Sequence, residues 1–518
     1  MSSKTTSVTV SSMSLLPFLL TLYSVAPFSI PFTIEQELEY LSAQPLELSA
    51  PDSFSRDLIT QTTAPEIIPY IQEVRPLPGE LDDVPVFNSN SPELIENDGI
   101  LLSTFPTRGK ADPEAHLDYA FEGRFDIFDH HVVRARDDSD TRTRYLGIVV
   151  HNPSNRPVTL RFREAASYLS QEAPWYGRND VEFNLASNQF SGPGSRLMND
   201  ILRDRRQLFW PDQITISPRE THLLLNAPLP VRSLSVATDG SLTEDDELLP
   251  PLPKSLRGDR SNARSTLLRL SSDGPVYVAS LTMLAPLTAG GERVPSLAEW
   301  LQILINGSLA TPRDLKPTQP GRQADRFIYG RVAGVSQGSR WQARLTDRGS
   351  SQLAIPPKGQ QISYAISTVD HNTFGTGQIQ SAPMLRRYSD TAYRAHGNYG
   401  TEYDLTLPLY NPTDQPKTIA LSIQTPLQNE NLKNALTFLT PHGSRIFFRG
   451  TVLFLYTNDQ GERRADYIHL VQRRGQIGPP LIELTLAPGE ERFMEVQFLY
   501  PPDATPPQVL TLTTYENN

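Results

Sequence analysis

The chain has 518 residues, a formal net charge of −11, 45 prolines and no cysteine. The lack of cysteine excludes disulfides, thiol catalysis, cysteine-ligated metal clusters and lipid attachment through cysteine. At roughly 150 residues per domain, the length predicts two to four domains. Residues 35–98 carry 14 acidic and 2 basic residues, whereas residues 99–518 are neutral. This distribution argues against nucleic acid as a partner, because phosphate binding needs a basic face.

The first 32 residues read as an export signal. Lys4 is the only charged residue before Glu35, and an apolar stretch covers 15–28. Small residues at 24–26 are suited to signal cleavage. An uncleaved membrane anchor is the alternative, but prolines interrupt the stretch and it is short for a bilayer span. We therefore expect an exported protein of the periplasm or cell surface, with no membrane span in the mature chain.

Residues 33–111 form the next segment. Prolines alternate there with acidic and short apolar patches, which prevents long helices and limits strands to sheet edges. The pattern predicts an extended, Pro-rich acidic arm that becomes ordered from about Arg75 onward.

From Leu117 the pattern changes to short strands of 4–8 residues separated by turn residues. Such a run favours antiparallel β-sandwiches over a parallel α/β sheet. We predict a mainly β fold with two related antiparallel β-sandwich modules, at 112–290 and 322–518. A helical connector at 291–321 separates them: Ser296 and Glu299 form a capping box, and Gly307 lies at the helix end. A second short helix is predicted over Arg196–Arg206, with its last arginines in solvent.

The two modules share a sequence unit. YLGIVVHNPSNRPVTLRFR at 145–163 and YDLTLPLYNPTDQPKTIALSI at 403–423 both place Asn-Pro-(Ser/Thr) between alternating strands. Asn152 and Asn411 can each start a turn through a side-chain-to-backbone bond. A second pair of similar segments follows at 214–225 and 484–496. Asp129-His130 and Asp370-His371 suggest a third pair.

No motif predicts catalysis. Gly334-Val335-Ser336-Gln337-Gly338 matches the nucleophile elbow of hydrolases, but the residues after it alternate like a strand, so a hairpin turn is the better interpretation. Phosphate-binding glycine loops and metal-binding histidine pairs are absent from the sequence. We assign no catalytic residue, metal ligand or cofactor.

The first two sets of candidate binding residues come from repeated dipeptides and from aromatic residues. His130, Asp370 and His371 would meet if the two Asp-His dipeptides came together in the fold, although buried structural histidines are the alternative. Trp175 and Tyr176 could stack on sugar rings, although packing is commoner for aromatic residues in β domains.

Several strings resemble a family of exported cyanobacterial proteins classed as a domain of unknown function. They are RPLPGELDDVPVFNSNSP at 75–92, GILLSTFP at 99–106, GRFDIFDHH at 123–131 and FGTGQIQSAPM at 374–384. The resemblance implies a periplasmic or surface protein and brings no reaction or cofactor. Phe374, Thr376 and Gln378 mark the last string as a candidate binding loop with a polar tip, or else as a turn that needs its two glycines.

We expect an exported envelope protein without catalytic activity, acting in structure, adhesion or binding. Its partner would be an envelope polysaccharide or another envelope protein. The alternative is a carbohydrate-binding or carbohydrate-active envelope enzyme, whose paired carboxylates would meet only in the fold.

Overall fold

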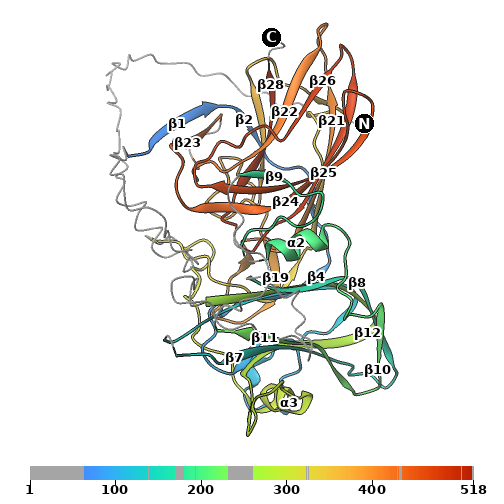
Figure 1. The fold of residues 1–518 in the computed structure, drawn as a ribbon, viewed down its shortest axis with the longest axis vertical. Helices are drawn as coiled ribbons and strands as arrows, with labels where there is room; N and C mark the ends of the chain where they lie inside the picture. The colour runs from blue at the N-terminus through green and yellow to red at the C-terminus, as the bar shows by residue number, and fades with distance from the viewer. Residues whose placement is uncertain are drawn as a thin grey trace, which may run out of the picture. The chain divides into compact units, whose positions relative to one another are not determined.

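The computed structural model describes residues 64–515, except 138, 171–179, 193, 232–260, 323, 325, 429, 431–433 and 503. These residues belong to one compact unit. Half of the described residues are in strands, which form several sheets, and the same part of the chain contains two α-helices (Figure 1). The mainly β fold class is confirmed. The predicted signal segment lies outside the described residues. Among the described residues, no helix has the length and apolar character of a membrane span.

The first sandwich consists of two layers joined by one long strand, β12 (Ser261–Leu284). Residues 261–276 of β12 pair in one layer and residues 277–284 pair in the other. A strand that changes layers in this way closes one corner of a sandwich. The core between the layers contains Phe125, Ile148 and Leu268. The first layer adds β4 (Pro85–Ser89), β6 (Phe121–Arg134), β8 (Val158–Leu169) and β10 (Gln213–Ile216); the second adds β5 (Gly99–Ser103), β7 (Thr143–His151) and β11 (Thr221–Pro230).

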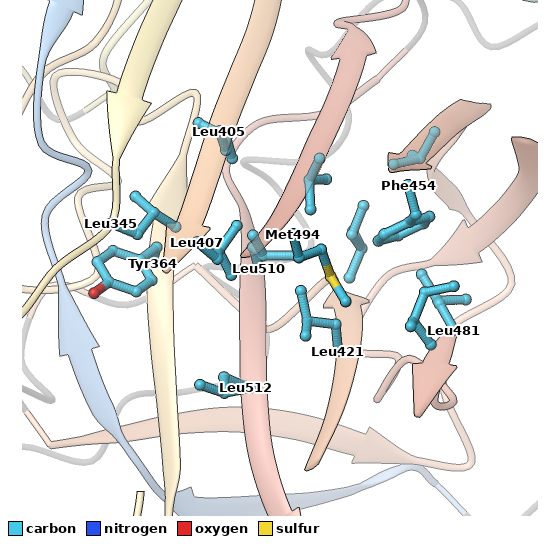
Figure 2. Close-up of a cluster of buried hydrophobic side chains, with 14 of the residues drawn as sticks. Leu345, Tyr364, Leu405, Leu407, Leu421, Phe454, Leu481, Met494, Leu510 and Leu512 are labelled. Carbon is cyan, nitrogen blue, oxygen red and sulfur yellow. The ribbon is translucent and has the colours of Figure 1, made fainter. Parts of the chain in front are cut away.

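The second sandwich packs an eight-stranded sheet against a five-stranded sheet. Leu405 and Met494 from the larger sheet meet Leu421 and Leu510 from the smaller one in a shared apolar core (Figure 2). The larger sheet contains β3 (Glu80–Leu81), β16 (Arg340–Arg344), β21 (Glu402–Tyr410), β27 (Glu491–Leu499), β24 (Ile446–Thr457), β25 (Arg463–Arg473), β9 (Val181–Phe183) and, beside β21, β17 (Leu353–Ala354). The smaller contains β2 (Glu73–Arg75), β18 (Gln361–Ile366), β28 (Gln508–Tyr515), β22 (Lys417–Gln424) and β26 (Ile482–Leu486).

Several strands pair across the predicted module boundaries. β15 (Ala333–Gln337) pairs with β4, and β19 (Ala382–Arg387) pairs with β15 and β20 (Arg394–Ala395), so all three extend the first sandwich. In the other direction, β9 pairs with β25 of the second sandwich. The predicted domain limits remain predictions. The pairings show that each sandwich includes strands from both halves of the chain.

Residues 64–103 contain five strands, each paired with a different part of the chain. β1 (Glu66–Ile71) pairs with β23 (Ala435–Thr440), β2 with β18, β3 with β16, β4 with β6 and β15, and β5 with β12. The segment therefore runs from the second sandwich to the first. The described part of the predicted arm is integrated into the sheets.

The duplicated turn is confirmed in atomic detail. Asn152 and Asn411 are fully buried, and each accepts from the backbone N–H and the hydroxyl of the residue two positions later, Ser154 or Thr413. Each also donates through Nδ2 to three carbonyls: those of Arg156, Ile216 and Ser217 at 2.7, 3.0 and 3.1 Å, and those of Gln415, Leu486 and Ala487 at 2.9, 3.0 and 3.1 Å. The third suggested pair is wrong, because Asp129-His130 lies within β6 whereas Asp370-His371 follows the end of β18.

The two helices begin close to their predicted positions. α3 (Leu297–Asn306) has the predicted capping box, and its Trp300 is fully buried over Gly147. The remaining short elements are β13 (Leu287–Thr288), β14 (Gly291–Glu292) and a 3₁₀ turn at Pro113–Ala115. α2 (Ser195–Ile201) is shorter than predicted, because the chain turns after Leu202.

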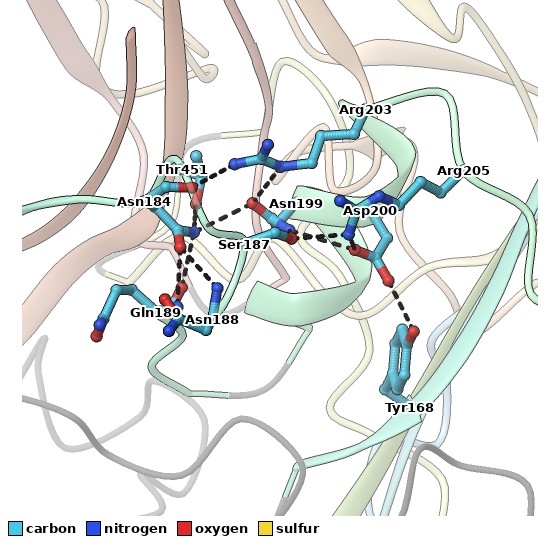
Figure 3. A network of polar contacts seen from close by, with 10 residues as sticks. All are labelled: Tyr168, Asn184, Ser187, Asn188, Gln189, Asn199, Asp200, Arg203, Arg205 and Thr451. Carbon is cyan, nitrogen blue, oxygen red and sulfur yellow. Dashed lines mark hydrogen bonds and ion pairs between the residues drawn. The ribbon is translucent and has the colours of Figure 1, made fainter.

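The segment around α2 attaches to the second sandwich through a polar network (Figure 3). Asn184 Nδ2 donates to Thr451 Oγ1 and to Asn199 Oδ1, each at 3.2 Å. Arg203 was expected in solvent, but its guanidinium carbon lies 3.6 Å from the centre of the Tyr467 ring. That expectation is wrong, because cation–π contact and a bond to a backbone carbonyl engage the side chain.

Candidate functional site

His130 is buried on β6, where it has a structural environment. Its Nδ1 lies 2.7 Å from Ser265 Oγ on the neighbouring β12, and burial lowers the pKa of His130 to about 3. The ring is therefore neutral at pH 7. The structure does not bring His130 together with Asp370 and His371, because Asp129 and His130 are covered within the first sandwich.

The adjacent His131 holds the N-terminal strands in place. Its Nε2 lies 2.9 Å from Ser89 Oγ, and its Nδ1 lies 2.8 Å from the carbonyl oxygen of Pro92. A serine hydroxyl beside an imidazole is the arrangement of an activated nucleophile. Here both side chains are fully buried, so a substrate cannot reach them and the pair joins β4 to β6.

The sequence match to a nucleophile elbow does not form an elbow. Ser336 lies inside β15 and is buried, and the chain continues past Gly338 into β16 of another sheet. The expected hairpin is also wrong, because β15 and β16 do not pair with each other. An elbow requires a nucleophile exposed between a strand and a helix, which this strand does not provide.

The loop at 374–378 contacts the N-terminal segment. Phe374 is buried in an apolar cluster with Phe438, and Thr376 Oγ1 donates to the carbonyl of Thr373 at 2.7 Å. Gln378 accepts from the backbone N–H of Leu77 at 2.9 Å and donates to its carbonyl at 2.6 Å. The two glycines adopt positive φ angles of 76° and 71°, as the turn interpretation requires. These contacts give the loop a packing role, and ligand binding by it remains a prediction.

Asp370 and His371 contribute to a surface cluster that we call the aromatic patch. It consists of Phe327, Tyr329, Asp370, His371, Arg394 and His396. The rings of Phe327 and His371 lie 4.2 Å apart between centres, and Phe327 meets Tyr329 edge to face at 4.8 Å. His371 is exposed and the two aromatic rings are half-buried. The patch is thus the part of the predicted site that reaches solvent.

The charged groups of the patch surround one carboxylate. Asp370 lies 3.7 Å from Arg394 Nε and 3.4 Å from His396 Nδ1. Burial lowers the pKa of His396 to about 3, so this imidazole is neutral at pH 7. Arg394 supplies the positive charge, with 40% of its side chain exposed. Among the described residues no cluster of histidines and carboxylates is suited to a metal ion.

Sequence reasoning missed four of these six residues: Phe327, Tyr329, Arg394 and His396. The alternation of Phe327 and Tyr329 was visible, but the ring contacts depend on loops that meet only in the fold. Trp175 and Tyr176, the other predicted sugar-binding residues, lie outside the described residues.

A second set of charges, also missed, is buried where the two sandwiches meet. Arg269 on β12 lies 2.8 Å from Glu402 on β21 and 3.8 Å from Asp126 on β6. Glu164 lies opposite Arg269 on β8, and Arg340 pairs with both Glu402 and Asp404. Burial, the largest influence, raises the pKa of Asp126 to about 6 despite the nearby arginines.

Comparisons with known proteins give a family but no activity. No curated protein matches the chain. Among solved structures, Lac15 from a marine microbial metagenome is 10% identical, with 73% of this chain and 84% of that chain covered and a TM-score of 0.08. The Macrobrachium rosenbergii nodavirus structure is 11% identical, with 95% and 100% covered and a TM-score of 0.11. A model of proteins of unknown function, DUF3370, matches residues 72–514. The chain therefore belongs to the DUF3370 family.

Proposed function

We propose that this is an exported envelope protein that acts by binding and does not catalyse a reaction. The observation that carries the proposal is that the carboxylates gathered around Arg269 are buried. Asp126, Glu164 and Glu402 surround Arg269, and all are largely buried. Catalytic carboxylates must face a substrate across an open site, whereas these acids balance an arginine inside the protein.

Export is supported by the sequence of the first 32 residues. Mass spectrometry of the protein recovered from its native host would test it, with a new N-terminus expected after the small residues at 24–26. Recovery of the intact chain from the cytoplasm would contradict the proposal.

The absence of catalysis is testable with the purified chain. We expect no turnover of glycoside, ester or peptide substrates above a buffer control. Turnover that Asp126→Asn or Ser336→Ala abolishes, without loss of the folded state by circular dichroism, would contradict it.

A second candidate, carbohydrate binding, is favoured by the aromatic patch. Phe327 and Tyr329 are partly open rings, and aromatic rings pack against the apolar faces of sugars. Asp370 and Arg394 lie beside them and can bond to hydroxyl groups. The patch contains one carboxylate, whereas glycoside hydrolysis uses two, so binding without cleavage is its chemistry.

Titration calorimetry with envelope polysaccharide tests this candidate. We expect Phe327→Ala to weaken binding by at least tenfold. The matched control is Phe493→Ala, which removes an exposed phenylalanine outside the patch, where Arg344 lies over its ring. Equal effects of the two substitutions, or no binding by the wild type, would exclude the patch as a sugar site.

A further inference from the structure

In the part of the chain that the structure describes, the ribbon formed by β1 and β23 has one open edge. Among the described residues, β1 pairs only with β23, and Figure 1 shows the two strands together. The other side of β23 is occupied, because Leu439 N–H donates to the carbonyl of Gly475 and the carbonyl of Thr437 accepts from Leu427. The open edge of the ribbon is therefore that of β1.

The same hydrogen bonds show which backbone groups of β1 lie on that edge. Because Leu439 and Thr437 direct their backbone groups away from β1, the residues opposite them, Ile67 and Pro69, cannot bond to β23 through theirs. Gln72 belongs to the alternate set of residues, whose backbone groups point toward β23, because its N–H donates to the carbonyl of Asn434. The groups of Ile67, Pro69 and Ile71 thus face outward, and Pro69, at the centre, has no N–H.

The outward set is also apolar and accessible. Ile67 is 54% exposed and Ile71 is 86% exposed, whereas Tyr70 on the other face packs against Phe438. A short exposed strand with apolar side chains and unpaired backbone groups is a template for pairing with another strand.

A second copy of the same strand fits this edge. In an antiparallel pair centred on residue 69, Ile67 meets Ile71 of the other copy, Ile68 meets Tyr70, and Glu66 meets Gln72, so no like charges are opposed. The only defect is at the centre. Each isoleucine pair can exchange two backbone hydrogen bonds, whereas two facing prolines exchange none and oppose their carbonyls.

We propose that Pro69 prevents the open edge of β1 from pairing with the β1 of a second copy. The effect depends on the position of the proline, because a proline on the β23-facing side of the strand would disrupt the ribbon and leave the outer edge complete. The proposal is independent of the aromatic patch and of export.

Sedimentation equilibrium of the full chain tests whether Pro69 prevents dimerisation. We expect Pro69→Val to lower the dissociation constant of a dimer at least tenfold relative to wild type, and the further change Ile71→Lys to reverse the effect. Pro383→Val is the matched control, since Pro383 is an exposed strand proline whose neighbours are already paired. It should leave the association state unchanged.

The register is tested by Pro69→Cys, in a chain that has no other cysteine. This substitution restores the N–H and places one thiol opposite its copy, so mild oxidation should give a covalent dimer. Ile71→Cys alone should not, because residue 71 faces residue 67. A Pro69→Val chain that sediments like wild type, or a wild-type dimer that Ile71→Lys dissociates, would overturn the proposal.

Discussion

Equivalent positions in the two sandwiches carry different chemistry. Leu270 of β12 pairs with Phe162, and Leu512 of β28 pairs with Leu421; Phe162 and Leu421 each follow their turn asparagine by ten residues. In the row of residues next to Leu270 and Leu512, the first sandwich has charged side chains on three strands, whereas the second has hydroxyl side chains. The charged row is Glu164, Arg269 and Asp126; the hydroxyl row is Ser422, Thr511 and Ser363.

Each row matches what packs on it. Arg269 bonds to Glu402 of the other sandwich at 2.8 Å. Ser363 Oγ lies 2.8 Å from Thr511 Oγ1 and donates to Gln72 at 2.6 Å. The two sandwiches therefore share the turn and the strands around it, whereas the central row of each differs according to the groups that pack against it.

The largest expected effect separates the two rows. Arg269→Met removes the arginine that Asp126, Glu164 and Glu402 surround, although Glu402 stays paired with Arg340. Breaking a buried ion pair from one side costs about 3–5 kcal/mol. The matched change Thr511→Val removes a neutral hydrogen bond, at about 1 kcal/mol. Urea unfolding at pH 7 measures both. Equal losses would show that the two rows are energetically alike.

The next effect tests what the two sandwiches share. Asn152→Ala and Asn411→Ala each remove a buried amide that donates to three carbonyls and accepts two hydrogen bonds, so we expect each to lower the free energy of unfolding by about 3–4 kcal/mol. Because the two hydrogen-bond sets are the same, the two losses should agree within about 1 kcal/mol. A larger difference in urea would break the equivalence of the turns.

A smaller effect depends on pH. The pKa of Asp126 is about 6 in the folded protein, above the usual 3.8 of an aspartate, so the native state retains a proton that the unfolded state releases. Wild-type stability should therefore fall relative to Asp126→Asn as pH rises from 4 to 6, by about 2–3 kcal/mol. Denaturant midpoints across this range measure the difference. Ser363→Ala, at the equivalent hydroxyl, keeps Asp126, so its stability should stay parallel to that of wild type across this range.

The smallest effect concerns the turn hydroxyls. Ser154 and Thr413 each bond to the turn asparagine at 2.7 Å, and both lie near the surface. Ser154→Ala and Thr413→Ala should each cost about 0.5–1 kcal/mol. Thermal unfolding of the pair should show matching small shifts, and a loss as large as that of the asparagines would assign the turn's stability to the hydroxyls.

The local features of the fold were predictable from the sequence. Asn152 and Asn411 start their turns through bonds to the residue two positions later, and the capping box of α3 spans only Ser296 to Glu299. Alternation along a strand indicates that it is a strand, but it does not name its partner. The placement of β15 and β19 in the first sandwich depends on pairing with distant β4, so no local pattern contained it.

The candidate site was predicted only in part. Asp370 and His371 were named because of a repeated dipeptide, although the repeat itself does not correspond in the fold. Phe327 and His396 join them through loops on either side of the sequence, and Arg269 was one of 40 arginines with no mark in the sequence. Contacts of this kind depend on chain folding over long separations.

The strands between residues 64 and 103 have a consequence for how the protein is made. They are synthesised early, yet β1 cannot pair before residues 435–440 have been made, and β2 cannot pair before residues 361–366 have been made. A topology so rich in distant contacts slows folding and leaves strand edges exposed in the meantime. Nearly the whole polypeptide must therefore leave the ribosome before the second sandwich can close around its N-terminal strands.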